Sequence, residues 1–220
     1  GNSPVAADWF EVTNVGARAA NITGWKVDDS SESPAAALAL GGITSIAPGE
    51  SVIFIETADL ASARAAFLRN WFGASPPPAL RIGSYSGAGI GLSTGGDAVN
   101  LYDSGNTRRV NVAFGISPGS APFATFDNRA GLNVATLSTL SAVGVNGAFV
   151  AANSPSEIGS PGRISGRSFA GVYFGTLSNG GTFALFINDK NAGAFLGYVP
   201  GARTGYISRS VSVSDNSSHN

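Results

Sequence analysis

The chain has 220 residues, with 30 glycines, 11 prolines and a formal net charge of −1. It contains no cysteine and one histidine, His219, which excludes disulfides, thiol catalysis and thiolate or histidine-built metal sites. A Ser-His-Asp triad would need His219, which we expect to be an exposed residue of the polar C-terminal run. The small net charge disfavours a general nucleic-acid or anionic-membrane binder. Composition therefore offers little support for catalysis.

The remaining composition favours a folded, β-rich and exported protein. Hydrophobic residues make up 43% of the chain and charged residues only 12%, so it has enough apolar material for a core. Abundant Gly, Ser, Thr and Asn fit strands joined by tight turns. No apolar run approaches the 18 residues of a membrane-spanning helix, so no membrane insertion is expected. The absence of methionine indicates a processed chain, either a mature protein after signal-peptide removal or a fragment of a larger one.

The first half of the chain predicts strands and a single helix. Strands are expected at 8–15 and 22–27 from their aromatic and β-branched residues. The turn at 47–50 leads into 51–56, a short continuous apolar run that predicts a strand buried on both faces. Between Asp59 and Gly73 apolar residues recur at helical spacing, which predicts a helix with Thr57 or Asp59 as N-cap and Gly73 as C-cap.

The second half predicts strands joined by glycine-rich turns. Strands at 98–103 and 109–114 flank a turn at 103–106, and 118–150 is loop-rich. A boundary is expected near 154–162. Four strand-length runs then predict an antiparallel meander, at 169–177, 182–188, 192–198 and 203–214. In the last run, Ile207, Val211 and Val213 are expected on one face and serines on the other.

Five stretches carry a family resemblance. They are 8–14, 22–30, 46–52, 91–103 and 157–162, including Trp9-Phe10-Glu11-Val12, Gly24-Trp25, Pro48-Gly49-Glu50, Gly95-Gly96-Asp97 and Ser160-Pro161-Gly162. In this order they resemble a bacterial lamin-tail domain over residues 5–163. The resemblance implies an immunoglobulin-like β-sandwich, with the 59–73 helix and the 83–96 glycine-dense loop as an insertion. It also implies a non-enzymatic domain, of a kind attached to secreted hydrolases and surface proteins. We therefore predict a mainly β protein with domains at 1–163 and 164–220, the second a small antiparallel meander.

Asp28, Asp29 and Glu32 form the densest acidic cluster and are the candidate metal ligands. Hard oxygen ligands without His or Cys are typical of calcium, the one cofactor considered. The cluster lacks the spacing of a twelve-residue calcium loop. The alternative is a solvated loop whose Asp and Ser side chains bond to the local backbone.

The candidate self-association residues lie in the last 55 residues. A sheet of four short strands has little chain with which to cover two faces, and both faces of this one carry large apolar residues. The candidates are Tyr173, Phe174, Phe186, Tyr198 and Tyr206.

These observations favour a secreted or cell-surface, non-enzymatic structural protein that self-assembles, as an extracellular filament or surface-layer subunit. The expected partners are copies of the same chain. The alternative is an accessory binding module of a larger secreted hydrolase or surface protein, with a cell-surface protein or polysaccharide as ligand. An enzyme using paired carboxylates such as Glu50 and Glu56 is the third hypothesis. No catalytic residue is assigned.

Overall fold

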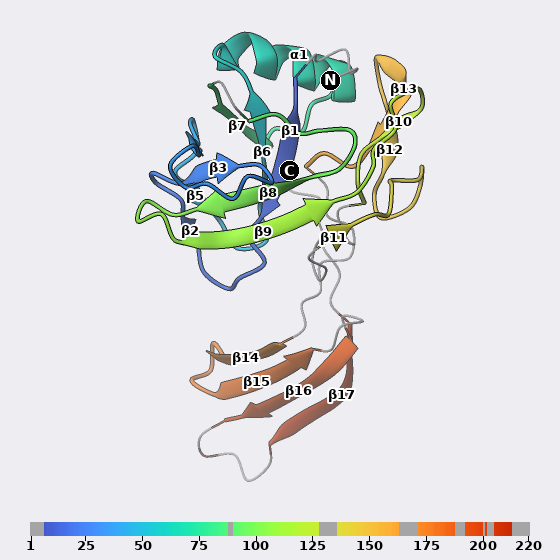
Figure 1. Cartoon of the computed structure of the whole chain (residues 1–220). Coiled ribbons are helices and arrows are strands. Elements are labelled where there is room, and N and C mark those ends of the chain that lie inside the picture. The colour runs from blue at the N-terminus through green and yellow to red at the C-terminus, as the bar shows by residue number, and fades with distance from the viewer. Residues whose placement is uncertain are drawn as a thin grey trace. The chain divides into compact units, whose positions relative to one another are not determined.

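The computed structural model describes residues 7–87, 90–127, 136–162, 171–187, 192–199, 201 and 205–212, the last range without side chains for 206–212 (Figure 1). The chain divides into two compact units, Gly1–Ser165 and Gly166–Asn220, which are described separately. The sequence-based boundary at 163/164 falls outside the described residues, as does His219. The described chain is mainly β with one helix, which confirms the predicted fold class.

Unit 1 is built around two packed sheets (Figure 1). The smaller has the order β1-β6-β7, in which β6 pairs antiparallel with β1 and parallel with β7. The larger has the order β11-β9-β8-β3-β4. The strands of these two sheets are β1 (Trp9–Thr13), β3 (Lys26–Asp28), β4 (Leu38–Ala39), β6 (Ser51–Glu56), β7 (Arg81–Tyr85), β8 (Asp97–Tyr102), β9 (Arg108–Phe114) and β11 (Thr136–Leu137).

Strand β6 is buried on both faces, as its sequence predicted, because it stands between two hydrophobic cores. Val52 and Phe54 belong to the core between the two sheets. Ile53 and Ile55 point the other way, into a core shared with helix α1 (Leu60–Phe72). Unit 1 therefore has three layers, a helix over a sheet over a sheet, with β6 in the middle layer.

The predicted helix is confirmed, with Asp59, one of the two candidate residues, as its N-cap and Gly73 as its C-cap. The Asp59 side chain accepts a hydrogen bond from the backbone N–H of Ser62 at 3.1 Å. Gly73 ends the helix with a φ of 59°, in the left-handed region that glycine tolerates. The aromatic residues of the last turns pack inward, where Trp71 meets Trp9 edge-on at 5.9 Å between ring centroids.

The predicted strand at 22–27 is wrong over its first four residues. The N–H of Trp25 donates to the carbonyl of Ile22 at 3.0 Å, which closes a turn, and β3 begins only at Lys26. Gly24 sits in that turn with a φ of 73°. A side chain there would also meet the Cβ of Ser104 at 3.2 Å. Glycine is therefore required by both the backbone conformation and the close packing.

The other strands of unit 1 form a hairpin and two small sheets. The β8–β9 hairpin is confirmed, and its turn closes with the N–H of Asn106 on the carbonyl of Asp103 at 2.9 Å. The stretch 154–159, which composition placed at a boundary, is strand β13 and pairs with β12 and β10. The small sheets are formed by β2 (Ala20–Asn21) with β5 (Ser45–Ile46), and by β10 (Phe123–Ala124), β13 (Ser154–Gly159) and β12 (Phe149–Ala151).

Unit 2 is the predicted antiparallel meander, in the order β14-β15-β16-β17. The expectation that Ile207 and Val211 share a face is wrong. A register shift between Gly193 and Phe195 pairs Ile207 with Leu196 but Val211 with Gly193, on opposite faces. Val213 lies outside the described residues. The strands are β14 (Gly171–Thr176), β15 (Thr182–Ile187), β16 (Ala192–Tyr198) and β17 (Tyr206–Ser212).

Candidate functional site

One face of the unit 2 sheet carries exposed apolar side chains. Val172 pairs with Phe186, Phe174 with Ala184 and Ala184 with Leu196, so cross-strand pairing places these residues on one face. Phe174 is 78% exposed, and the others with large side chains are about half exposed. We call this surface the exposed face; its large residues are Val172, Phe174, Phe186, Leu196 and Tyr198.

The opposite face of the same sheet is covered by its own rings. Phe183 and Phe195 stack at 5.6 Å between ring centroids and 27° between planes. Glycines on this face make room for them, because a Cβ on Gly175 would lie 2.6 Å from the Phe183 ring. A Cβ on Gly197 would likewise lie 2.9 Å from the Phe195 ring. Flat rings over glycine backbone therefore shield this side of the sheet, whereas the exposed face has no such cover within the described sheet.

The predicted self-association residues divide between the two faces. Phe174, Phe186 and Tyr198 lie on the exposed face, whereas Tyr173, itself 40% exposed, pairs with Leu185 on the opposite face. Tyr206 pairs with Gly197, also on the covered face, and its side chain lies outside the described atoms. Sequence reasoning missed Val172 and Leu196. Strict two-residue alternation, counted outward from Phe174 and Phe186, would have found both.

Three of the four strands of this sheet are uncharged, and the fourth, β17, contains Arg209. β14, β15 and β16 contain no Asp, Glu, Lys, Arg or Pro. Among the described strands, β14 has a neighbour on one side only, so it is an edge of the sheet. Natural edge strands are usually protected by charges, prolines or bulges against pairing with another chain. β14 has none of these, which makes it suited to contact another molecule.

The candidate metal ligands lie in unit 1, on and after β3. The carboxylate of Asp28 is buried and accepts from the hydroxyl of Ser31 at 3.1 Å and the N–H of Ser33 at 2.6 Å. Asp29 accepts from the N–H of Ser31 at 2.8 Å. These bonds fold the loop back onto its own acidic residues, the arrangement that the alternative reading of the cluster described.

Glu32 points to a different partner. Its carboxylate lies 2.7 Å from the Arg108 guanidinium on β9, where it forms an exposed ion pair. In the described part of the chain, no group of three or more His, Cys, Asp or Glu residues is placed to hold a metal ion. Calcium binding by Asp28, Asp29 and Glu32 stays a prediction.

Glu50 and Glu56, the carboxylates considered for acid–base chemistry, have different surroundings. Arg81 holds both oxygens of Glu50 at 2.6 Å. This pairing lowers the pKa of Glu50 from its ordinary value. Burial, with the nearby charge of Asp8, raises the pKa of Glu56. Arg81 also donates to the carbonyl of Ser45 at 2.6 Å, so the pair ties β7 to the 45–50 segment, which is a structural role.

The geometry of unit 1 agrees with the comparison with protein families. The sequence model of the lamin tail domain matches residues 1–115, which span β1 to β9 and helix α1. The chain belongs to the lamin tail domain family. The match covers the two packed sheets except β11, and strands β10 to β17 lie beyond it. No curated protein and no solved structure matched the chain.

The lamin tail domain is a non-catalytic, immunoglobulin-like type of domain. Among the described residues, no helix is long and apolar enough to cross a membrane.

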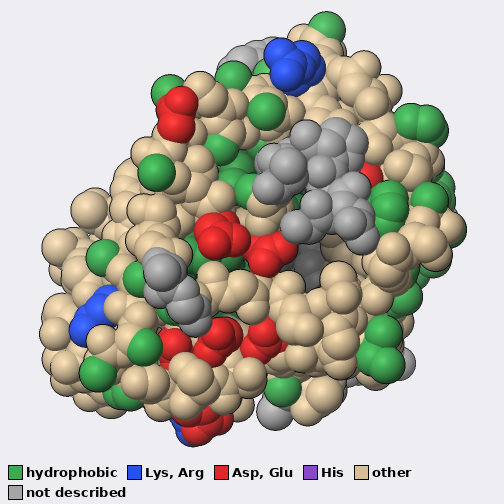
Figure 2. All heavy atoms as spheres, turned by 45° about the horizontal axis from the view of Figure 1, so that its top comes forward, with side chains coloured by type: hydrophobic (Ala, Val, Ile, Leu, Met, Phe, Trp, Pro, Cys, Tyr) green, Lys and Arg blue, Asp and Glu red, His purple; other side chains and the backbone are tan. Residues whose placement is uncertain are grey.

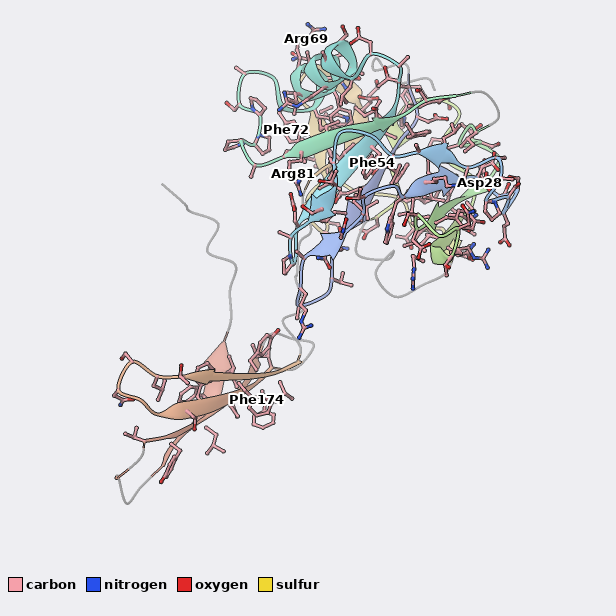
Figure 3. All side chains as sticks on the ribbon, turned by 90° about the vertical axis from the view of Figure 1, so that its left-hand side faces the viewer. Asp28, Phe54, Arg69, Phe72, Arg81 and Phe174 are labelled. Atoms are coloured by element: carbon pink, nitrogen blue, oxygen red, sulfur yellow. The ribbon has the colours of Figure 1, made fainter. Side chains whose placement is uncertain are left out.

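Figure 2 shows acidic side chains across the middle of the face it presents, with basic ones only at the margins of that view. Figure 3 places Phe54 among the crowded side chains of unit 1 and Phe174 on the small sheet of unit 2.

Proposed function

We propose that this lamin tail domain protein is a secreted, non-enzymatic structural protein that assembles with copies of itself, as a subunit of an extracellular filament or surface layer. The observation that supports the proposal best is the exposed face of unit 2. A contiguous set of large apolar side chains at this level of exposure is typical of an interaction site. A second copy is a suitable partner because β14, β15 and β16 contain no charged residue, so these strands of two copies do not repel each other.

The edge of the same sheet supports the proposal independently. Pairing between two β14 edges about a two-fold axis normal to the sheet would place Val172 and Phe174 of both copies on one continuous apolar face. Such a joint sheet would still present apolar surface to further copies. Location outside the cell is supported by the absence of Cys and Met and by only 2 lysines, since these residues suffer oxidation or proteolysis there.

The test is the association state of the full chain over a wide concentration range, measured by sedimentation velocity and electron microscopy. We expect concentration-dependent oligomers. The double variant Phe174→Ser/Phe186→Ser should weaken association at least tenfold. Ile116→Ser is the matched control, since Ile116 is 77% exposed but lies in unit 1, and it should associate like the wild type.

Two results would overturn the proposal. One is a wild-type chain that stays monomeric at millimolar concentration. The other is a double variant that keeps the sheet, as judged by far-UV circular dichroism, and associates like the wild type. A monomer that binds polysaccharide or a cell-surface protein would favour the accessory-module alternative.

A further inference from the structure

A cavity of about 450 Å³ lies in unit 1 beside strand β1. One side is lined by the inward residues of β8 and β9, and the other by residues around helix α1 and β13. The volume is within the range of binding sites for small ligands and peptide side chains. We call this space the β1 cleft; the residues used below are Val110, Val112, Phe114, Glu11, Trp71 and Glu157.

The β1 cleft lies where the smaller sheet lacks a strand. Among the described strands, β1 has a neighbour only in β6, while the facing sheet continues through β9 to β11. Val110, Val112 and Phe114 on β9 line the cleft with half-buried apolar side chains, of which Val110 also packs against the core between the sheets and Phe114 against the Phe126 ring. One more strand beside β1 would complete the sandwich there.

The backbone of β1 presents hydrogen-bonding groups to the cleft. The backbone N–H of Asn14 donates to the carbonyl of Glu50, and the N–H of Glu56 donates to the carbonyl of Asp8. The backbone groups of the even-numbered residues of β1 therefore point toward β6. In an antiparallel pair, the N–H and C=O of the alternate residues point to the opposite side. The corresponding groups of Glu11 and its odd-numbered neighbours in β1 thus face away from β6, toward the side where the cleft lies.

Two buried polar atoms that line the β1 cleft lack a hydrogen-bond partner. They are Oε1 of Glu11 and Nε1 of Trp71, whose side chain is 2% exposed. The other oxygen of Glu11 accepts from the N–H of Gly162 at 2.8 Å. Burial raises the pKa of Glu11 to about 7 and outweighs the hydrogen bonds from the Gly162 N–H and the Ser51 side chain, which lower it. An unpaired buried polar atom is costly, so both atoms favour a ligand that supplies partners.

The charge of the lining indicates the sign of that ligand. Four acidic residues line the cleft, and no Lys or Arg is among its described lining residues. Asp8, Asp127 and Glu157 each accept from a protein donor, on Leu92, Asn146 and Asn70 respectively. Glu11 lies on β1 itself and has a buried carboxyl oxygen without a hydrogen-bond partner, so it is the carboxylate placed to meet a basic group of a strand added there.

We propose that the β1 cleft accepts an extended peptide segment of a partner protein, in which apolar side chains alternate with lysines. The segment adds to the free edge of β1 as a further strand. Its apolar side chains meet Val110, Val112 and Phe114, and a lysine on its other face meets Glu11. The inference is independent of self-assembly, because it concerns unit 1 alone.

The probe is the blocked pentapeptide acetyl-Val-Lys-Val-Lys-Val-amide, titrated into the full chain by calorimetry. The Phe174→Ser/Phe186→Ser background keeps association of copies from contributing to the signal. We expect saturable binding, weakened at least tenfold by Glu11→Gln and abolished by Val112→Phe, which fills the cleft. Glu56→Gln, a matched change on the neighbouring strand outside the lining, should bind like the parent protein.

Two control peptides separate charge from backbone pairing. Replacing both lysines with glutamate should remove binding, and N-methylation of alternate residues should weaken it at least tenfold. Hydrogen exchange should show new protection in residues 9–13 of the complex. No binding at millimolar peptide, equal binding of the glutamate peptide, or an unchanged affinity for Glu11→Gln or for the N-methylated peptide would overturn the proposal.

Discussion

Units 1 and 2 are both β-structures, but they bury their apolar residues differently. In unit 1 the middle strand β6 is covered on both sides, by a second sheet and by a helix. In unit 2 one face is shielded by stacked Phe183 and Phe195, while the other exposes Phe174 and its neighbours. Apolar strands are thus part of a closed core in unit 1 and part of an exposed surface in unit 2. The covering layers, not the strand sequences, make this difference.

The largest expected contrast is between two phenylalanines. Phe54→Ala should cost about 4 kcal/mol of unfolding free energy, because it leaves a cavity in a closed core. Phe174→Ala should change it by less than about 0.5 kcal/mol, as for an exposed site. Urea unfolding reports unit 1 through tryptophan fluorescence, since all 3 tryptophans lie there, and unit 2 through circular dichroism. An equal cost for both variants would mean that the exposed face is packed within the chain.

The next contrast is the response of unit 1 to pH. The pKa of Glu11 is about 7 in the folded chain against an ordinary value of 4.5, so the folded state holds the extra proton. Stability should therefore fall as pH rises from 4.5 to 7 and then level off. Glu11→Gln should remove this slope and be more stable at pH 8 by up to about 3 kcal/mol. Unfolding curves of the wild type and of Glu11→Gln at pH 5 and 8 test this. A wild-type free energy of unfolding that rises between these pH values relative to that of Glu11→Gln would contradict it.

A pair of glycines distinguishes a rigid core from an adaptable sheet. A Cβ on Gly83 would lie 2.4 Å from the carbonyl oxygen of Gly41 and 2.7 Å from the Phe54 ring. Because backbone cannot move aside, Gly83→Ala should cost about 2 kcal/mol. Gly175→Ala should cost less than about 1 kcal/mol, since only the Phe183 ring must shift. Gly91→Ala is the control in open space, and a cost at Gly175 above that at Gly83 would reverse the comparison.

The smallest expected effect comes from the partly exposed pair of Glu50 and Arg81. Glu50→Gln should cost about 0.5 kcal/mol at neutral pH, because solvent screens the pair. The pKa of Glu50 is lowered by Arg81, so this stabilisation should be lost as pH falls, the opposite sign to Glu11. Unfolding in 1 M salt is the check, and a cost unaffected by salt would contradict an ionic origin.

Sequence patterns correctly predicted those elements for which two independent local signals indicated the same structure. β6 combined a turn with a short apolar run, and α1 combined helical spacing with Asp59 and Gly73 as caps. The predicted strand at 22–27 was wrong over its first residues because a hydrogen bond from the Trp25 N–H to the Ile22 carbonyl closes a turn there, despite residues of high strand propensity. The prediction of which β17 residues share a face was wrong because a bulge, which alternation cannot reveal, changes the register near Gly193.

Predictability of the two candidate sites differs for a physical reason. The exposed face follows from two-residue alternation, so most of it was available from sequence. The β1 cleft brings β1, β9, α1 and β13 together, and only tertiary packing shows that Glu11 and Trp71 line the same space. The sequence placed Glu11 in a family-like strand but contained no signal that its carboxyl group is buried.

The alternation within β6 also bears on how unit 1 comes apart. Val52 and Phe54 belong to one core and Ile53 and Ile55 to the other, on consecutive residues of a single strand. Lifting the helix or separating the sheets would expose one side of the same backbone segment to water. Opening of either layer is therefore coupled to the other, and the β6 amides should be the slowest in the unit to exchange with deuterium. Helix α1 then behaves as part of one cooperative folding unit rather than as a detachable addition.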